Sequence, residues 1–194
     1  MIKFVILDIL KNKFVLIYTI ILSMLSWSVF GLEDNSAKGL LTLLNVILLT
    51  VPLVSIIFST MYIYSRAEFV ELLVSQPIKR KKIWLSLFFG LSISLVFSFI
   101  IGAGIPILIN VPTTLGLTMV AMGCIISLIF ISIAFFSSII SRDKAKGIGI
   151  SILSWLYFAI LFDGVVFFLL FQLSEYPIEK AMVGIIAFNP IDLA

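Results

Sequence analysis

One carboxylic acid, Asp163, stands inside a long apolar run and is the side chain whose chemistry is least expected there. If that run crosses a bilayer, a central aspartate costs roughly 3 kcal/mol on insertion scales, so it is expected to face protein or water. Such a group can bind a cation, relay a proton or polarise a substrate path. Two plainer interpretations stay open: a protonated Asp163 hydrogen-bonded to a Ser or Asn elsewhere, or a position nearer the membrane interface.

Three sulfur side chains, Met119, Met122 and Cys124, are the types that select Cu(I). On a helix Met119 and Met122 share a face, but Cys124 lies about 200° from Met122 at 100° per residue. Apolar filling is therefore the better account, and we expect no metal site. The chain contains no histidine, which excludes imidazole ligands and a histidine base within it.

Sequence motifs for catalysis are also missing. The chain has no G-x-x-x-x-G-K-[ST] phosphate loop, no H-E-x-x-H and no G-x-S-x-G. We therefore expect no catalytic residue in this chain, and we do not expect it to be an enzyme.

The composition explains why these polar residues are scarce. Of 194 residues, 62% are hydrophobic and 12% are charged, whereas soluble domains carry about 25% charged residues. The apolar runs exceed the roughly 18 residues that mark a spanning helix, and they do not alternate as barrel strands do. An all-α polytopic bundle follows. We expect five spans, at about residues 14–32, 40–63, 83–105, 115–140 and 148–172.

The basic residues predict how these spans are oriented. Eleven of the 13 Lys and Arg residues fall on one side: Lys3, Lys11, Lys13, Arg66, Lys79, Arg80, Lys81, Lys82, Arg142, Lys144 and Lys146. Only Lys38 and Lys180 fall on the other. The positive-inside rule then predicts a cytoplasmic N-terminus. This distribution also accounts for the net charge of +3 without a nucleic-acid partner.

Small residues recur at every fourth position of the third span, at Gly90, Ser94, Ser98 and Gly102. Such a stripe lets another helix approach closely, most commonly within the bundle, although dimerisation would use the same pattern. Pro52 predicts a kink in the second span. Gly104–Pro106 and Pro112 predict an irregular connection after the third.

Two elements on the predicted cytoplasmic side are amphipathic. Residues 2–12 place Val5 and Ile9 opposite Asp8 and Lys11, which is typical of an interfacial helix, although a simple extension of the first span fits nearly as well. The segment 65–77 is the second. Its apolar face holds Phe69, Val70, Leu73 and Val74, and its polar face holds Glu68, Glu71 and Ser75.

An acidic outer face is unusual for a helix bound only to a negative leaflet, so we expect residues 65–77 to dock a partner. Pro77 ends the segment, and the basic run 79–82 follows it. The alternative is a solvated loop whose basic run merely fixes topology. At the other end of the chain, Asn189–Pro190 is typical of a helix start, from which we expect a sixth span beyond residue 194. A five-span protein with an outer tail is the alternative.

Three motifs together resemble ABC-2 type transporter permeases, most closely their NosY-like branch. They are Leu10–Lys11–Asn12–Lys13, Glu68-x-x-Glu71–Leu72–Leu73-x-x-Gln76–Pro77-x-x-Arg80, and Asn189–Pro190-x-Asp192. The similarity covers essentially the whole chain, and its sharpest part is E-L-L-x-x-Q-P. Permeases of this family typically have six spans, so the chain departs from them by ending after Asp192.

The resemblance implies a permease in a bacterial or archaeal cytoplasmic membrane. Its partners would be a cytoplasmic ATPase subunit that binds ATP and Mg, and a second permease copy, with a periplasmic accessory protein as a further candidate. Residues 65–77 would be the coupling helix, with contacts from Arg66, Glu68, Phe69, Glu71, Leu73, Val74, Gln76 and Pro77. Members of the NosY-like branch serve maturation of the copper centres of nitrous oxide reductase. The chief alternative is a membrane assembly or signalling subunit that docks a partner without transport.

Overall fold

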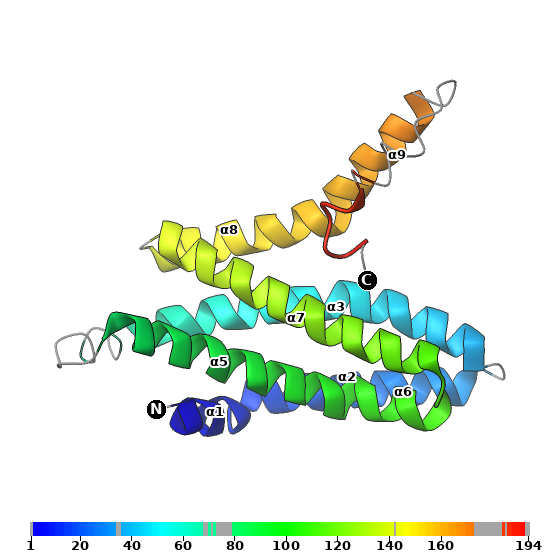
Figure 1. Ribbon diagram of the computed structural model, residues 1–194, viewed down its shortest axis with the longest axis horizontal. Coiled ribbons are helices and arrows are strands. Elements are labelled where there is room, and N and C mark those ends of the chain that lie inside the picture. The colour runs from blue at the N-terminus through cyan, green and yellow to red at the C-terminus, as the bar shows by residue number, and fades with distance from the viewer. Residues whose placement is uncertain are drawn as a thin grey trace.

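Helices make up all the regular structure in the residues that the computed structural model describes, namely 2–33, 36–67, 70, 72, 79–141, 143–172, 184 and 186–192. In chain order they are α1 (Ile2–Leu10), α2 (Lys13–Leu32), α3 (Ser36–Ser65), α5 (Arg80–Phe99), the π-helix η1 (Ile100–Gly104), α6 (Ile105–Asn110), α7 (Thr114–Ile140), α8 (Lys144–Leu156), the π-helix η2 (Tyr157–Leu161) and α9 (Phe162–Gln172). Figure 1 shows α2, α3, α5 and α7 running alongside one another. The predicted all-α class is confirmed.

Five helical stretches are long and apolar enough to cross a membrane: Lys13–Leu32, Lys38–Ser65, Arg80–Asn110, Thr114–Ile140 and Lys144–Gln172. Each covers one predicted span. The chain is therefore a multi-pass α-helical membrane protein. The first span begins where the sequence indicates, because the Asn12 side chain accepts a hydrogen bond from the Phe14 backbone N–H at 3.0 Å and caps α2.

The third span is longer than predicted. We expected it to end near residue 105 in an irregular connection, but α5, η1 and α6 form one continuous stretch to Asn110. The Ile105 backbone N–H donates to the Ile100 carbonyl, one residue further back than in an α-helix. Pro106 follows at the start of α6, where a missing N–H is tolerated. The non-helical connection is confined to residues 111–113.

The small-residue stripe of the third span faces other helices of the same chain. Gly90 lies directly against the Val5 side chain of α1. A Cβ at Gly102 would stand 2.9 Å from Leu22 Cβ and 3.0 Å from the Thr19 carbonyl, both in α2. Ser94 and Ser98 are buried between these two contacts. The stripe therefore brings α1 and α2 close to the third span.

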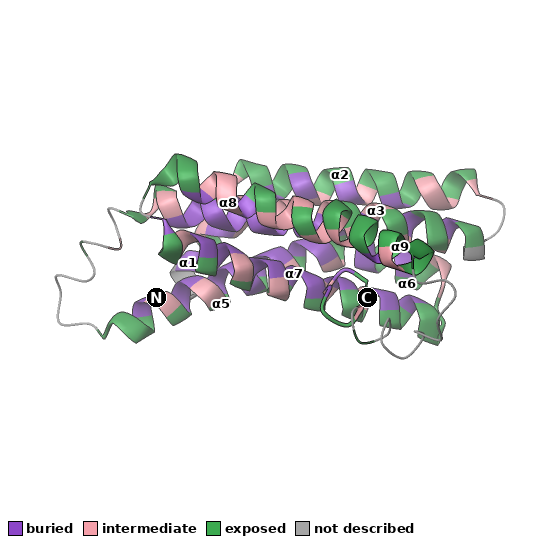
Figure 2. Ribbon diagram, turned by 90° about the horizontal axis from the view of Figure 1, so that it is seen from above, coloured by how far each residue is buried: buried purple, intermediate pink, exposed green. Residues whose placement is uncertain are grey.

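Burial falls from the third span to the fifth. Over its apolar part, 56% of the third span is buried, whereas only 11% of the fifth span is buried. Figure 2 shows mostly exposed residues along α9, with buried residues concentrated toward the middle of the bundle. In Figure 1, α8 follows α7 and the chain then turns away at η2, so that α9 stands apart from the other helices. An extra residue in a helical turn is a common cause of such a kink.

Candidate functional site

The end of α3 makes several polar contacts with other helices. The helix ends at Ser65, and both the Arg66 backbone N–H (3.1 Å) and the Ser65 hydroxyl (2.9 Å) donate to the Tyr62 carbonyl. These bonds satisfy a carbonyl in the last turn and fix the direction in which Arg66 leaves the helix. The segment that we predicted to dock a partner begins at this point.

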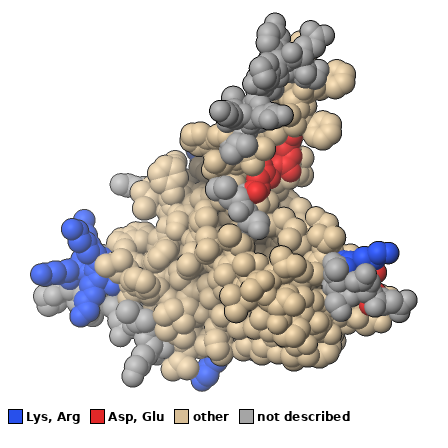
Figure 3. All heavy atoms as spheres, turned by 45° about the vertical axis from the view of Figure 1, so that its right-hand side comes forward, with Lys and Arg blue, Asp and Glu red and all other residues tan. Residues whose placement is uncertain are grey.

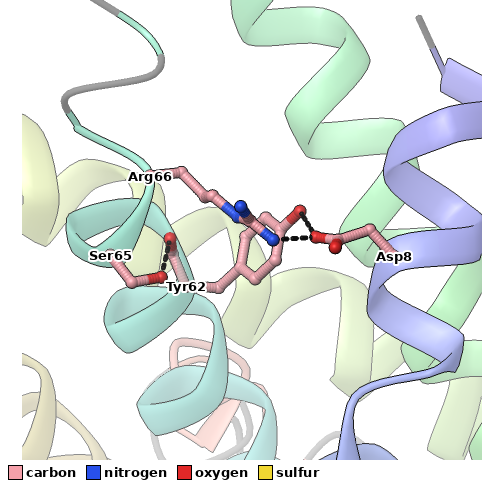
Figure 4. A network of polar contacts seen from close by, with 4 residues as sticks. All are labelled: Asp8, Tyr62, Ser65 and Arg66. Atoms are coloured by element: carbon pink, nitrogen blue, oxygen red, sulfur yellow. Dashed lines mark hydrogen bonds and ion pairs between the residues drawn. The ribbon is translucent and has the colours of Figure 1, made fainter.

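Asp8 of α1 meets this helix end (Figure 4). The Tyr62 hydroxyl donates to Asp8 Oδ2 at 2.9 Å, and Arg66 Nη2 forms an ion pair with the same oxygen. The guanidinium carbon of Arg66 also lies 5.6 Å from the centre of the Tyr62 ring, a cation–π distance. One carboxylate thus receives a neutral donor from the last turn of α3 and a charged donor from the residue that follows the helix.

Solvent screening limits the strength of this ion pair. The Arg66 and Asp8 side chains are 42% and 31% exposed, and exposed pairs contribute about 0.2–1 kcal/mol. Partial burial acts to lower the pKa of Arg66, but the hydrogen bond and charge of Asp8 outweigh it and raise that pKa above its ordinary value. Arg66 is therefore charged at every physiological pH, and the pair fixes geometry more than it adds stability.

A second tyrosine, Tyr64, ties the same helix end to the turn between α7 and α8. Its hydroxyl donates to the Ser141 carbonyl at 2.6 Å. Its ring lies directly against Gly147 in the first turn of α8, where a larger residue would collide with it. The turn itself is ordered by Asp143, which caps α8 by accepting a hydrogen bond from the Ala145 N–H at 3.0 Å.

One turn deeper, α3 and α8 share a buried hydrogen bond. The Thr60 and Ser151 hydroxyl oxygens lie 2.7 Å apart, and both side chains are fully buried. The contacts of Thr60, Tyr62, Tyr64 and Arg66 together define what we call the α3 junction. Through it, the end of α3 is linked to α1 on one side and to α8 on the other.

Val70, the next described residue after Ala67, lies over an apolar surface. The Val70 N–H donates to the Arg66 carbonyl at 2.9 Å, an α-helical bond, and the Val70 side chain packs against the buried cluster that contains Val5 and Leu87. A hollow of about 350 Å³ lies beside it. Its lining consists of Ile63, Tyr64, Ala67, Val70, Trp84, Leu87, Ser138 and Ser141.

The predicted coupling residues divide into two groups. Arg66 is in the α3 junction, where it pairs with Asp8 instead of serving only as a rim charge for a partner. Seven others lie outside the described residues: Glu68, Phe69, Glu71, Leu73, Val74, Gln76 and Pro77. The four small residues of the third span, Gly90, Ser94, Ser98 and Gly102, belong to the packing described above and do not reach the junction.

Asp163 lies far from the α3 junction, in the first turn of α9. It is exposed, and Asn189 Nδ2 approaches its Oδ1 at 3.5 Å, the outer limit of a hydrogen bond. Asn189 is fully buried and makes shorter bonds elsewhere: it donates to the Phe158 carbonyl of η2 at 2.9 Å and accepts from the Ile191 N–H at 3.1 Å. Asp163 therefore lies beside an asparagine, and its protonation and its role stay predictions.

The metal interpretation gains no support from the part of the chain that the structure describes. That part contains no group of three His, Cys, Asp or Glu side chains able to hold an ion. Met119 is buried in the main core cluster, and Cys124 packs against it. Both side chains thus lie among apolar residues, and the absence of a metal site stays a prediction.

Sequence reasoning missed Tyr62, Tyr64 and Gly147. Tyrosines within an apolar run give no periodic signal, and their partners lie 54 residues (Asp8) and 77 residues (Ser141) away in sequence. One feature of the sequence could have indicated these contacts: two tyrosines stand in the last turn of the second span, just before an arginine. Comparison with known protein families and with curated proteins found no match to this chain.

Proposed function

We propose that this chain is the membrane-spanning permease subunit of an ABC-2 type transporter, driven by a separate ATPase subunit and acting with a second permease copy. The observation that carries the proposal is the α3 junction. The polar amphipathic segment begins where α3 is linked to both α1 and α8, so a partner bound there would act on three helices together.

The proposed conformational change driven by the ATPase, which we call the ATPase stroke, starts at residues 65–77. An ATPase that binds their apolar face and moves on binding ATP would displace Arg66, and with it the end of α3. The hydrogen bond from Tyr64 to Ser141 and the bond between Thr60 and Ser151 would carry that displacement to the α7–α8 turn and to α8. Asp8 would carry it to α1. Hydrogen bonds of this kind transmit motion only if the linked helices move as a unit, which close packing favours.

Glycine at position 147 supports the same interpretation. Because Gly147 has no side chain, the Tyr64 ring of α3 lies directly against the α8 backbone there. The packing between these two helices is accordingly direct. A displacement of α3 would then reach the α8 backbone through the Tyr64 ring, with no α8 side chain between them.

Affinity purification from native membranes tests the proposal. We expect the chain to bring down an ATPase, and we expect Leu73→Asp to abolish its binding. Leu32→Asp is the matched control, because it changes an 82% exposed leucine at the opposite end of the bundle. Absence of ATP hydrolysis in the purified material, or equal binding by both variants, would overturn the proposal. A docking subunit that does not transport would bind a partner, but ATP hydrolysis would drive no flux of a substrate across the membrane.

A further inference from the structure

An outward-facing groove lies between α5 and α7, at the end of the bundle where the basic residues gather. Its volume is about 520 Å³, within the range of about 300–1,000 Å³ typical of ligand sites. Trp84 and Phe88 of α5 and Phe135 and Ile139 of α7 form most of its walls. Arg80 and Lys81 stand at its mouth.

The walls are apolar and preformed. The Phe135 ring lies 5.9 Å from the Trp84 ring and 5.5 Å from the Phe88 ring, both in edge-to-face geometry, which fixes the three side chains relative to one another. Ile139 is 66% exposed, so the groove opens away from the bundle. From Arg80 to Phe88 it extends about 12 Å along the helix, at 1.5 Å per residue. In a bilayer, a groove that opens away from the bundle is accessible to lipid.

The mouth of the groove is strongly positive. Lys79, Arg80, Lys81 and Lys82 are four consecutive exposed basic residues, and α5 begins among them without a side-chain cap. Among the described residues, the ion pair is Arg66–Asp8, which lies outside the groove. Neither Arg80 nor Lys81 pairs with a carboxylate of those residues. Figure 3 shows basic side chains gathered at the left end of the molecule. The backbone N–H groups that open α5 add to the positive potential.

We propose that this groove binds one anionic phospholipid, with its phosphate at Arg80 and Lys81 and an acyl chain against Trp84, Phe88 and Phe135. Charge complementarity selects this occupant. A basic mouth above an apolar channel matches an amphiphile with a negative head and an apolar tail. A second copy of the chain, paired through the same face, would bring two basic ends together. Free phosphate fits the site less well than a phospholipid, because it would occupy the basic mouth and leave the apolar channel empty.

Lipid binding to the purified full chain tests this proposal and does not depend on the transporter role. Native mass spectrometry would compare phosphatidylglycerol with phosphatidylcholine of the same acyl chains. We expect phosphatidylglycerol to bind at least tenfold more tightly. Each basic residue near a membrane surface contributes about 1 kcal/mol of attraction, so the double variant Arg80→Gln, Lys81→Gln should lose about tenfold or more. The control, Lys144→Gln with Lys146→Gln, removes the same charge from the start of α8 and should bind normally.

A second variant tests the apolar part of the site. Ser132 of α7 is an exposed residue of the groove wall, so Ser132→Trp should fill the channel without disturbing the core. We expect it to lose phosphatidylglycerol with both basic residues intact. Three results would overturn the proposal: equal loss in both charge variants, displacement of the lipid by inorganic phosphate at matched ionic strength, or a Ser132→Trp variant that retains lipid while its dimers dissociate.

Discussion

Arg66, the residue immediately after α3, forms an ion pair with Asp8 of α1, and Tyr62 donates to the same carboxylate oxygen. The N-terminal helix is thus linked to the end of the second span by side chains 54 and 58 residues away from Asp8 in sequence. An amphipathic helix that only lay on the membrane surface would need no such link. The α1 helix also packs against the bundle, where Val5 and Ile9 are buried, and its place at the membrane interface stays a prediction.

A charge exchange tests this link. Asp8→Asn and Arg66→Gln should each lower stability by about 1 kcal/mol or less, since the pair is partly exposed. The exchanged pair Asp8→Arg with Arg66→Asp should recover part of that loss. If the link transmits the ATPase stroke, ATP hydrolysis by the complex should become uncoupled in the single variants and recover in the exchanged pair. Identical hydrolysis in all four proteins would contradict a transmitting role.

The contact between Tyr64 and Gly147 predicts a large effect from a single methyl group. Gly147→Ala should destabilise the protein by about 1–3 kcal/mol, because the added Cβ collides with the tyrosine ring. Gly149→Ala is the matched control two residues later, where nothing lies within 4 Å. That change should be neutral or stabilising, since alanine favours a helix over glycine by about 0.5–1 kcal/mol. Thermal unfolding in detergent measures both, and equal melting temperatures would show that the contact is not tight.

The position of α1 against the third span gives a second packing prediction. Gly90→Leu should push Val5 away and destabilise the protein by about 1–3 kcal/mol, whereas Gly164→Leu, which meets open space on α9, should not. Proteolysis near residue 10 should accelerate only in the first variant. A stable Gly90→Leu protein that forms fewer dimers would instead indicate that the stripe contacts a second copy.

Asn189 is predicted to hold the bend in the fifth span. Asn189→Leu removes the side-chain donor to the partly buried Phe158 carbonyl, and the loss of such a hydrogen bond costs about 0.5–1.5 kcal/mol. Asn45→Leu is the control, because Asn45 is exposed and bonds only to Leu41 of its own helix, at 3.2 Å. Thermal unfolding should separate the two variants. If both melt alike, the bend does not depend on Asn189.

Orientation can be measured with single cysteines in a Cys124→Ser background. The charge distribution predicts that Lys38→Cys reacts with an impermeant maleimide in intact cells and that Lys144→Cys reacts only after lysis. The reverse pattern would place the α3 junction and the basic groove outside. It would then exclude a cytoplasmic ATPase as the partner of residues 65–77.

The sequence predicted the spans well because each is a long apolar run bounded by polar residues. Asn12 and Lys13 mark the start of α2 with a recognisable cap, and the expected end of the fourth span at residue 140 agrees with α7. The third span could not be bounded in the same way. Residues 99–109 are almost uniformly apolar, so no periodicity distinguishes a π-turn and a proline-containing helix from an irregular connection.

The α3 junction was only partly predictable. Arg66 and the polar face of α1 were visible in the sequence, but their pairing was not. An amphipathic pattern indicates which face of a helix is polar, but it does not indicate which residue contacts that face. Tyr62 and Tyr64 have partners on different helices, and these pairings depend on where α1 and α8 lie relative to α3. The position of α1 depends on its contact with Gly90 of α5, and that of α8 on the contact between Gly147 and Tyr64. Neither role appears until the facing side chains are known.

The most direct test of the account uses the complex purified with its ATPase. A spin label at Thr113→Cys, in the connection at the far end of the bundle, would be placed on each permease copy in a Cys124→Ser background. Pulsed electron spin resonance then measures the distance between the two labels. We predict that trapping ATP with vanadate shifts this distance, and that Asp8→Asn reduces the shift. An unchanged distance in a complex that hydrolyses ATP would contradict the proposed transmission from residues 65–77 through the α3 junction.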